Sequence, residues 1–73
     1  MPVIPKHRRL LAEAVRAKRK EAGLSQEKLA EKADLSAVFI SRIERGKESP
    51  SIDNLLKIAR ALGSHVRELV SEF

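Results

Sequence analysis

Serines and glycines recur in this sequence at intervals of about one short helix. A serine that precedes a helix can cap it, because its hydroxyl accepts a hydrogen bond from a free backbone N–H of the first turn. A glycine that follows a helix readily adopts the left-handed conformation that ends it. The serines that stand before apolar, helix-sized stretches are Ser25, Ser36, Ser51 and Ser64, and the glycines that follow such stretches are Gly23, Gly46 and Gly63. This punctuation predicts five short helices and no strand.

Apolar residues recur within these stretches at the spacing of one helix face. The expected helices run from Pro5 to Ala22, from Gln26 to Ala33, from Ala37 to Arg45, from Ser51 to Leu62, and from Ser64 to the C-terminus, with each serine as a cap. The fourth helix is expected to face the core with Ile52, Leu55, Leu56, Ala59 and Leu62. A chain of 73 residues has room for one domain. We therefore expect a compact all-α domain over residues 8–73, preceded by a flexible basic arm over residues 1–7.

Composition excludes several classes of small protein. The chain has no cysteine, so neither disulfides nor a thiolate zinc site can stabilise it, and a reducing cytoplasm is the expected location. No apolar run approaches the roughly 18 residues that cross a membrane. His7 and His65 stand alone, and no serine has a nearby His and Asp partner. We therefore expect no metal, no cofactor and no catalytic site.

The positive charge is concentrated near the N-terminus. Fifteen Lys and Arg against ten Asp and Glu give a net charge of +5, and residues 1–20 alone carry +6. A basic end on a small chain indicates a polyanionic partner, such as nucleic acid or anionic lipid, although a solvated helix face has the same composition. The bases nearest the N-terminus, Lys6, Arg8 and Arg9, either reach flanking phosphates or only solubilise the chain, and the sequence leaves both alternatives open.

The second and third expected helices are separated by only three residues, Asp34, Leu35 and Ser36. Two short helices joined so tightly form a helix-turn-helix. The residues expected to fill the inward positions of this motif are Leu29, Ala30, Ala33, Leu35, Ile40 and Ile43. The outward face of the third helix then carries small and basic side chains, which fit a DNA major groove about 12 Å wide.

The stretch LSQEKLAEKADLSAVFISRIERGKESPSIDNLLKIARALG resembles the Cro/CI-type, or XRE-type, helix-turn-helix regulators. With the first helix included, the resemblance covers residues 8–70 and rests on the combination LSQ…LA…ISRIERG…PS…LLKIA. It implies a lambda-repressor-like fold with the helix-turn-helix at the second and third helices. The small size is also similar to the controller proteins of restriction–modification systems.

The resemblance also implies a role for individual residues. The positions that face base edges are occupied by Ala37, Val38, Ser41 and Arg42, and the positions that contact phosphates by Gln26, Arg45 and Lys47. Gln26 is also expected to brace the third helix, and Ser36 is expected to act first as a cap and in addition to contact a phosphate. Arg42 is the expected specificity determinant, because a guanidinium can bond guanine O6 and N7 together. An ion pair between Arg19 and Glu44 is implied between the first and third helices. Where the family often has glycine in the turn, this chain has Asp34, which tolerates left-handed geometry better than most residues.

A last apolar stripe near the C-terminus consists of Val66, Leu69, Val70 and Phe73. The stripe either packs back onto the first and fourth helices or pairs with a second copy of the chain. Terminal helices commonly pair in small members of this family, and a small domain gains buried area by pairing. We therefore expect these four residues to form a homodimer interface.

Together these features predict a homodimeric, sequence-specific transcription regulator that binds a palindromic DNA operator and represses, or activates by touching RNA polymerase. One alternative is an antitoxin that binds a toxin protein and represses its own operon. The other is a basic module for a membrane surface or RNA. The first helix has few bulky apolar residues for a membrane, and the chain has almost no aromatic residues for base stacking, so this second alternative is weak.

Overall fold

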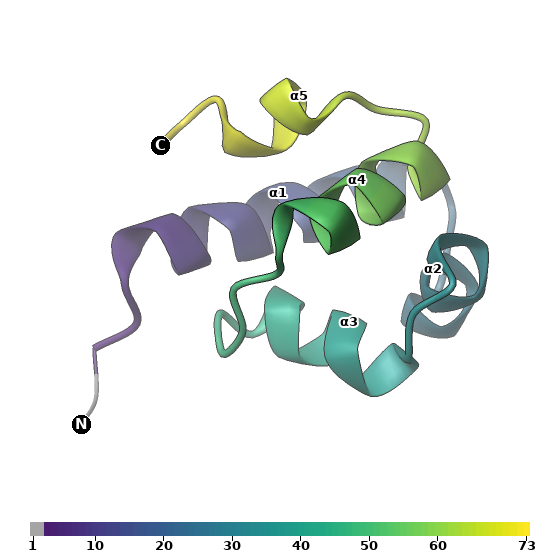
Figure 1. The fold of residues 1–73 in the computed structure, drawn as a ribbon, viewed down its shortest axis with the longest axis horizontal. Coiled ribbons are helices and arrows are strands. Elements are labelled where there is room, and N and C mark those ends of the chain that lie inside the picture. Colours follow the sequence, from purple (N-terminus) through teal and green to yellow (C-terminus); the bar gives the residue numbers. More distant parts are fainter. Residues whose placement is uncertain (1–2) are drawn as a thin grey trace.

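The computed structural model describes residues 3–73, which form five α-helices and no strand (Figure 1). The helices are α1 (Lys6–Glu21), α2 (Gln26–Ala33), α3 (Ala37–Glu44), α4 (Ile52–Ala61) and α5 (Val66–Val70). The prediction of an all-α, five-helix domain is therefore confirmed. Within the described part of the chain, no helix combines the length and the apolar character needed to cross a bilayer.

The helices are arranged around α1 and α4, which lie in the middle of the molecule (Figure 1). On one side, α3 packs against α1 and α2, and on the opposite side α5 packs against α1 and α4. The C-terminus returns to the beginning of α1, where the rings of His7 and Phe73 lie 6.3 Å apart, centroid to centroid. The helix-turn-helix is thus separated from the C-terminal helix by the two central helices.

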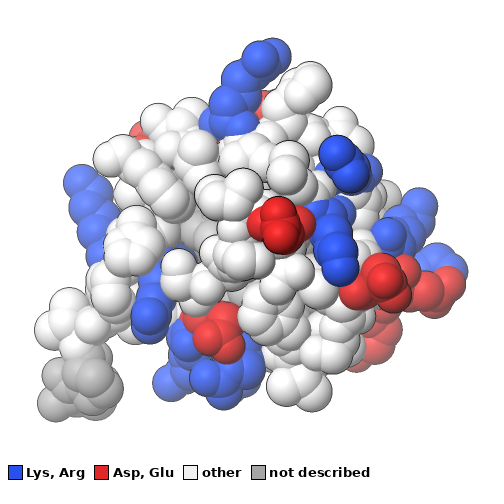
Figure 2. Space-filling model, in the orientation of Figure 1, with Lys and Arg blue, Asp and Glu red and all other residues white. Residues whose placement is uncertain are grey.

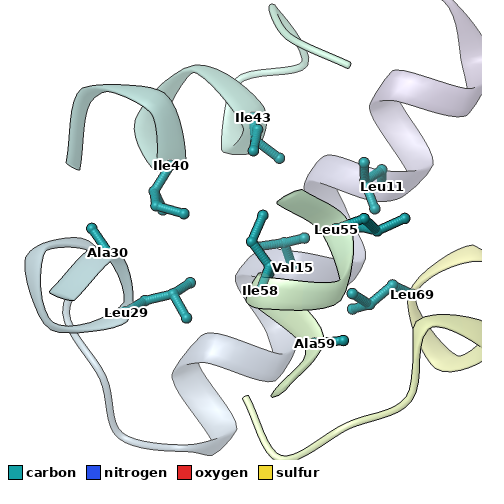
Figure 3. Close-up of a cluster of buried hydrophobic side chains, with 10 residues drawn as sticks. All are labelled: Leu11, Val15, Leu29, Ala30, Ile40, Ile43, Leu55, Ile58, Ala59 and Leu69. Carbon is teal, nitrogen blue, oxygen red and sulfur yellow. The ribbon is translucent and has the colours of Figure 1, made fainter. Parts of the chain in front are cut away.

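All five helices contribute to one aliphatic core (Figure 3). Its members are Leu11, Val15, Leu29, Ala30, Ile40, Ile43, Leu55, Ile58, Ala59 and Leu69. Ile40 and Ile43 are completely inaccessible to solvent, as are Val15 and Ile58 on the central helices. Because both isoleucines of α3 are enclosed, the core fixes which face of α3 remains exposed.

Three of the four serine caps form as expected. The hydroxyls of Ser25, Ser36 and Ser51 each accept a hydrogen bond from the backbone N–H three residues later, at 3.0–3.1 Å. These bonds satisfy one of the free donors that every helix leaves at its first turn. The starts of α2, α3 and α4 are therefore the predicted ones.

The fourth cap, expected at Ser64, is wrong. The Ser64 backbone N–H still bonds the Ala59 carbonyl at 2.9 Å and belongs to the end of α4. His65 is the N-cap of α5, and its N–H is satisfied by the carboxylate of Glu68 at 2.7 Å. That bond, together with a weaker one from Lys18, lowers the pKa of Glu68.

The boundaries of α1 and α3 also differ slightly from the expected ones. Helix α1 begins at Lys6, with Pro5 as its N-cap, so the last two residues of the segment 1–7 expected as an arm are helical. Residues 1–2 of that segment lie outside the described residues. Helix α3 ends at Glu44, and Arg45 is its C-cap.

The inward face of α4 is shifted from the predicted one. Leu55, Ile58 and Ala59 are buried, whereas Ile52 and Leu56 are exposed. Residues three and four apart share a helix face, which places Ile58 beside Leu55 and leaves Leu56 about 100° around the helix. Ile58 was not among the expected core residues, although it is completely enclosed.

The turn of the helix-turn-helix depends on one left-handed residue. Asp34 has φ 56° and ψ 47°, and no other described non-glycine residue has a positive φ. This conformation lets the Leu35 N–H bond the Ala30 carbonyl at 2.9 Å, which ends α2 and starts the turn. A residue with a Cβ is sterically strained in this region, but the left-handed conformation allows the two helices to be joined by only three residues.

We expect Asp34→Gly to raise the free energy of unfolding by up to about 1 kcal/mol, because glycine has no Cβ to strain in the left-handed region. Asp34→Ala should lower it by about 1 kcal/mol, since alanine adopts this region less readily than aspartate. Urea unfolding of the two variants and the parent measures both values. A loss of stability in Asp34→Gly would mean that the aspartate side chain itself stabilises the turn.

Candidate nucleic-acid interface

One face of α3 is turned away from the core. Val38 is 70% exposed and Arg42 is exposed, while Ala37 and Ser41 are partly buried on the same side of the helix. Val38, Ser41 and Arg42 are therefore brought together on one surface, and Ala37 lies at its edge, where it also packs against the core cluster. Phe39 lies at the edge of this surface and packs against the core cluster.

The residues expected to contact phosphates flank this surface. Gln26 is the first residue of α2, and Ser36 is the exposed N-cap of α3, so both stand at helix N-termini, where free backbone N–H groups favour an anion. Arg45 and Lys47 are exposed at the other end of α3. Sites for phosphates are thus available before and after the base-facing residues, as a helix lying in a groove between two backbones requires.

Glu44, the last residue of α3, is a buried carboxylate with only 2% of its surface exposed. Arg19 of α1 pairs with it through two bonds, Nε to Oε2 at 2.7 Å and Nη2 to Oε1 at 2.9 Å. The Arg19 Nη1 also donates to the Leu24 carbonyl at 2.9 Å. The hydrogen bond to Glu44 raises the pKa of Arg19, although burial of the guanidinium opposes it. The two-pronged geometry fixes α3 relative to α1.

Two further side chains converge on Glu44. The Gln26 amide donates to Glu44 Oε1 at 3.2 Å, and Arg16 donates to the Glu44 main-chain carbonyl, one of the free acceptors at the end of α3. The resemblance implies that Gln26 braces the third helix, but it does not name Glu44 as the partner. The Arg16 contact was not predicted, and the one signal for it in the sequence is that Arg16 and Arg19 lie three residues apart and so share a face of α1. Glu44 thereby links the expected phosphate residue Gln26 to the end of the base-facing helix.

Arg42 has a partner that the sequence analysis also missed. Its Nε donates to Glu48 Oε1 at 3.4 Å, and both side chains are partly exposed. The backbone explains this approach, because Gly46 has φ 73° and the Lys47 N–H bonds the Arg42 carbonyl at 2.9 Å, which turns the chain back along α3. The bond occupies Nε, so the two terminal amino groups of Arg42 remain suited to a planar, two-pronged contact.

The charges around α3 are mainly positive at its C-terminal end. Figure 2 shows basic side chains gathered below the loop that leaves α3, with an acidic side chain beside them. Arg45 and Lys47 form no ion pair among the described residues, and Arg42 forms the one with Glu48. This end of α3 is the part of the interface best suited to attract a polyanion.

The residues expected at a dimer interface separate into two groups. The prediction is wrong for Leu69, which is only 2% exposed and belongs to the core, so it is not available to a second chain. Val66 and Val70 are partly buried, and Phe73 is 58% exposed. These three line a mainly apolar groove with Ile52 and Leu55 of α4, and His7 and Arg8 of α1 also line it. An apolar surface therefore remains at this edge without Leu69.

Comparison with known proteins gives a consistent set of relatives. The HTH_3 family, described as helix-turn-helix, matches residues 15–69. Control protein C.BamHI of Bacillus amyloliquefaciens is 46% identical over 50 residues, which are 68% of this chain and 62% of that protein. The immunity repressor of Bacillus phage phi105 is 42% identical over 62 residues, which are 85% of this chain and 43% of the repressor. The chain thus spans less than two thirds of both relatives.

This chain matches a solved structure over a larger share of that protein's length. The restriction–modification controller protein C.AhdI from Aeromonas hydrophila superimposes with a TM-score of 0.83 and 37% sequence identity. The match covers 85% of this chain and 94% of that one. The five-helix arrangement is therefore shared with a protein of similar size.

We expect Arg19→Met to lower the free energy of unfolding by about 3–5 kcal/mol, because methionine keeps the apolar stem but leaves the Glu44 carboxylate buried without its cation. Adding Glu44→Gln should recover part of this loss, since the buried charge is then removed as well. Urea unfolding of the single and double variants measures the coupling. Arg9→Met is the matched control, because its ion pair with Glu13 is exposed and should contribute under about 1 kcal/mol. Strictly additive losses in the cycle would contradict a cooperative pair.

Proposed function

The chain belongs to the HTH_3 helix-turn-helix family, and from this we propose that it is a sequence-specific DNA-binding regulator of transcription. The observation that carries the proposal is the exposed face of α3, where Val38 and Arg42 stand between flanking groups suited to phosphates. The resemblance seen in the sequence is confirmed by the match over residues 15–69. The named relatives are control and repressor proteins rather than enzymes, and they give the antitoxin alternative no support. A regulator of this kind acts where the DNA is, in the cytoplasm.

In the proposed complex, contacts to the DNA backbone orient the protein. Gln26 and Ser36 meet one backbone at the N-termini of α2 and α3, and Arg45 and Lys47 meet phosphates near the C-terminal end of α3. The contact from Glu44 holds the Gln26 amide in place, and its second N–H stays free for a phosphate oxygen. Such contacts fix the register of α3 in the groove and contribute affinity for any sequence.

Base recognition is assigned to the centre of the exposed face. Arg42 offers its two terminal amino groups to guanine O6 and N7, and Val38 offers methyl groups to the methyl of thymine. In the free protein Glu48 engages only the Arg42 Nε, which leaves the terminal amino groups of Arg42 available. The exposed pair contributes under about 1 kcal/mol, so it costs little to rearrange when DNA binds.

The proposal includes a homodimer on a palindromic operator. Its support is the apolar groove lined by Val66, Val70 and Phe73 beside Ile52, at one edge of the molecule. A two-fold axis through this edge would present two copies of α3 to successive half-sites, as dimeric helix-turn-helix proteins do. Regulation would then follow operator occupancy, with repression, or activation through contact with RNA polymerase, set by where the operator lies.

Selection of bound duplexes from a random DNA pool tests the proposed function. We expect a palindromic consensus of two half-sites whose centres are about one helical turn, or a multiple of it, apart. The same selection with Ile52→Glu/Phe73→Glu should yield no palindrome, because charges in the groove prevent pairing. Enrichment of no sequence by the parent chain would contradict specific DNA binding, whereas a consensus without symmetry would contradict only the dimer.

We expect Arg42 to determine sequence specificity and Lys47 to contribute affinity for any sequence. Arg42→Ala should cost about 1–3 kcal/mol per half-site on the selected operator and relax preference at one symmetric base position. Lys47→Ala should weaken binding to all sequences about equally, because Lys47 lies beyond the end of α3 and reaches phosphates only. It should also lower the slope of log affinity against log salt by about one per subunit.

Titration of the operator and of a scrambled duplex at several salt concentrations measures these effects. Six to ten phosphate contacts in the parent dimer should cost a factor of about 10³–10⁵ in affinity between roughly 50 and 200 mM salt. An equal loss on both duplexes for Arg42→Ala would mean that Arg42 contacts the backbone. The face assigned to base reading would then be wrong.

A further inference from the structure

A hollow lies between the start of the chain and the end of α3. Its walls include Ile4 before α1, Arg8 in the first turn of α1, Arg42 on α3, and Gly46 and Lys47 in the loop that follows. Three of these residues are cationic, and no acidic residue lines the hollow. The hollow therefore has the charge of an anion-binding site, and the sequence leaves open whether Arg8 reaches a flanking phosphate or only solubilises the chain.

The backbone around the hollow is held in place by close packing. Gly46 is buried with φ 73°, and a Cβ added to it would lie 2.9 Å from Ile4 Cγ2. Ile4 therefore covers Gly46, and the segment before α1 is fixed against the loop after α3. The Lys47 N–H bonds the Arg42 carbonyl, so the backbone that carries Lys47 is fixed to α3 as well. Cations from three separate segments are thus held in one place.

Arg8 differs from the other arginines of α1 in that its side chain has no hydrogen-bond partner among the described residues. Its Nε is enclosed by protein and makes no hydrogen bond, and the side chain forms no ion pair among the described residues. The neighbouring Arg9 pairs with Glu13 at 3.2 Å, and Arg19 pairs with the buried Glu44. Arg8 and Lys47 are therefore the two cations of the hollow that no acidic residue of the described chain neutralises.

We propose that the hollow binds one phosphate of the DNA backbone, with Arg8 and Lys47 as its charged ligands, at the flank of the bases read by α3. The inference deepens the proposed function and rests on it. The position favours a phosphate carried by DNA over a free anion, because the hollow shares a wall, Arg42, with the base-reading face. A DNA backbone that leaves the major groove at the C-terminal end of α3 passes Arg42. Arg8 then extends the interface from the helix-turn-helix to α1.

The test compares Arg8→Met with Arg9→Met. Each variant removes one positive charge from adjacent positions of α1, so the long-range attraction of DNA falls equally. Loss of a phosphate contact should lower the slope of log affinity against log salt by about 0.9 per subunit in Arg8→Met, on operator and scrambled duplexes alike. Arg9→Met should keep the parent slope, because Arg9 is already paired with Glu13 and does not line the hollow. Equal slopes in the two variants would overturn the proposal.

Thermal unfolding shows whether the variants remain folded. If Arg8→Met does not fold, Arg8→Gln takes its place, because the amide keeps a polar group beside the enclosed site while removing the charge, and the same loss of slope is expected. A parent protein whose affinity does not depend on salt would instead contradict the proposed function itself.

A second experiment distinguishes a phosphate of the DNA backbone from free inorganic phosphate as the ligand of the hollow. Millimolar inorganic phosphate is added to the parent protein and the operator, with ionic strength held constant by chloride. We expect the affinity to stay at the parent value. A fall to the level of Arg8→Met would mean that the hollow takes free phosphate as readily, and would overturn the assignment to DNA.

Discussion

The side of the molecule that carries α2 and α3 depends on the hydrogen bonds to one buried carboxylate, that of Glu44. A charge that is 98% removed from solvent carries a desolvation penalty of several kcal/mol, which is repaid only if every acceptor position is well used. Here Arg19 supplies two donors and Gln26 a third. Because these donors come from α1 and from the start of α2, satisfying the carboxylate also fixes both elements relative to the end of α3.

The aliphatic core and this polar cluster constrain α3 in different ways. Ile40 and Ile43 fix which face of α3 is buried, but apolar contacts alone tolerate small rotations and shifts. Hydrogen bonds to Glu44 have a narrow range of angle and distance, so they set the remaining rotation of the helix. The same bonds orient the Gln26 amide. The side chains proposed to read bases, and the proposed phosphate ligand Gln26, are thus positioned by the same two features.

The sequence predicts those parts of the structure that local chemistry decides. The caps at Ser25, Ser36 and Ser51 were predictable because a hydroxyl at a helix start has one favourable partner three residues later. Ser64 is not the cap because its N–H makes the closing bond of α4 to the Ala59 carbonyl, as the Leu35 N–H does to Ala30 at the end of α2, so the N-cap falls one residue later, on His65.

Tertiary packing decides the rest. Leu69 and Phe73 share one stripe in the sequence, yet Leu69 is enclosed between α5 and the central helices, whereas Phe73 lies beyond the end of α5 and is exposed. In the candidate site, Ala37 to Arg42 could be assigned from the motif, and Gly46 could be assigned as a helix end, but the approach of Glu48 to Arg42 depends on the path of the chain after Gly46, which spacing does not specify.

Much of the positive charge in the N-terminal segment is paired within the folded protein. Residues 1–20 carry +6, which by composition alone reads as one basic surface for a polyanion. Much of this charge is used within the protein, since Arg9, Lys18 and Arg19 pair with acids and Arg16 donates to a helix end.

The unpaired positive charge is then found at the C-terminal end of α3, where Arg45 and Lys47 have no acidic partner among the described residues. Arg8 is the member of the basic segment that reaches the same place. Net charge therefore overstates how many Lys and Arg side chains are available to the proposed DNA partner, because folding pairs several of them within the protein.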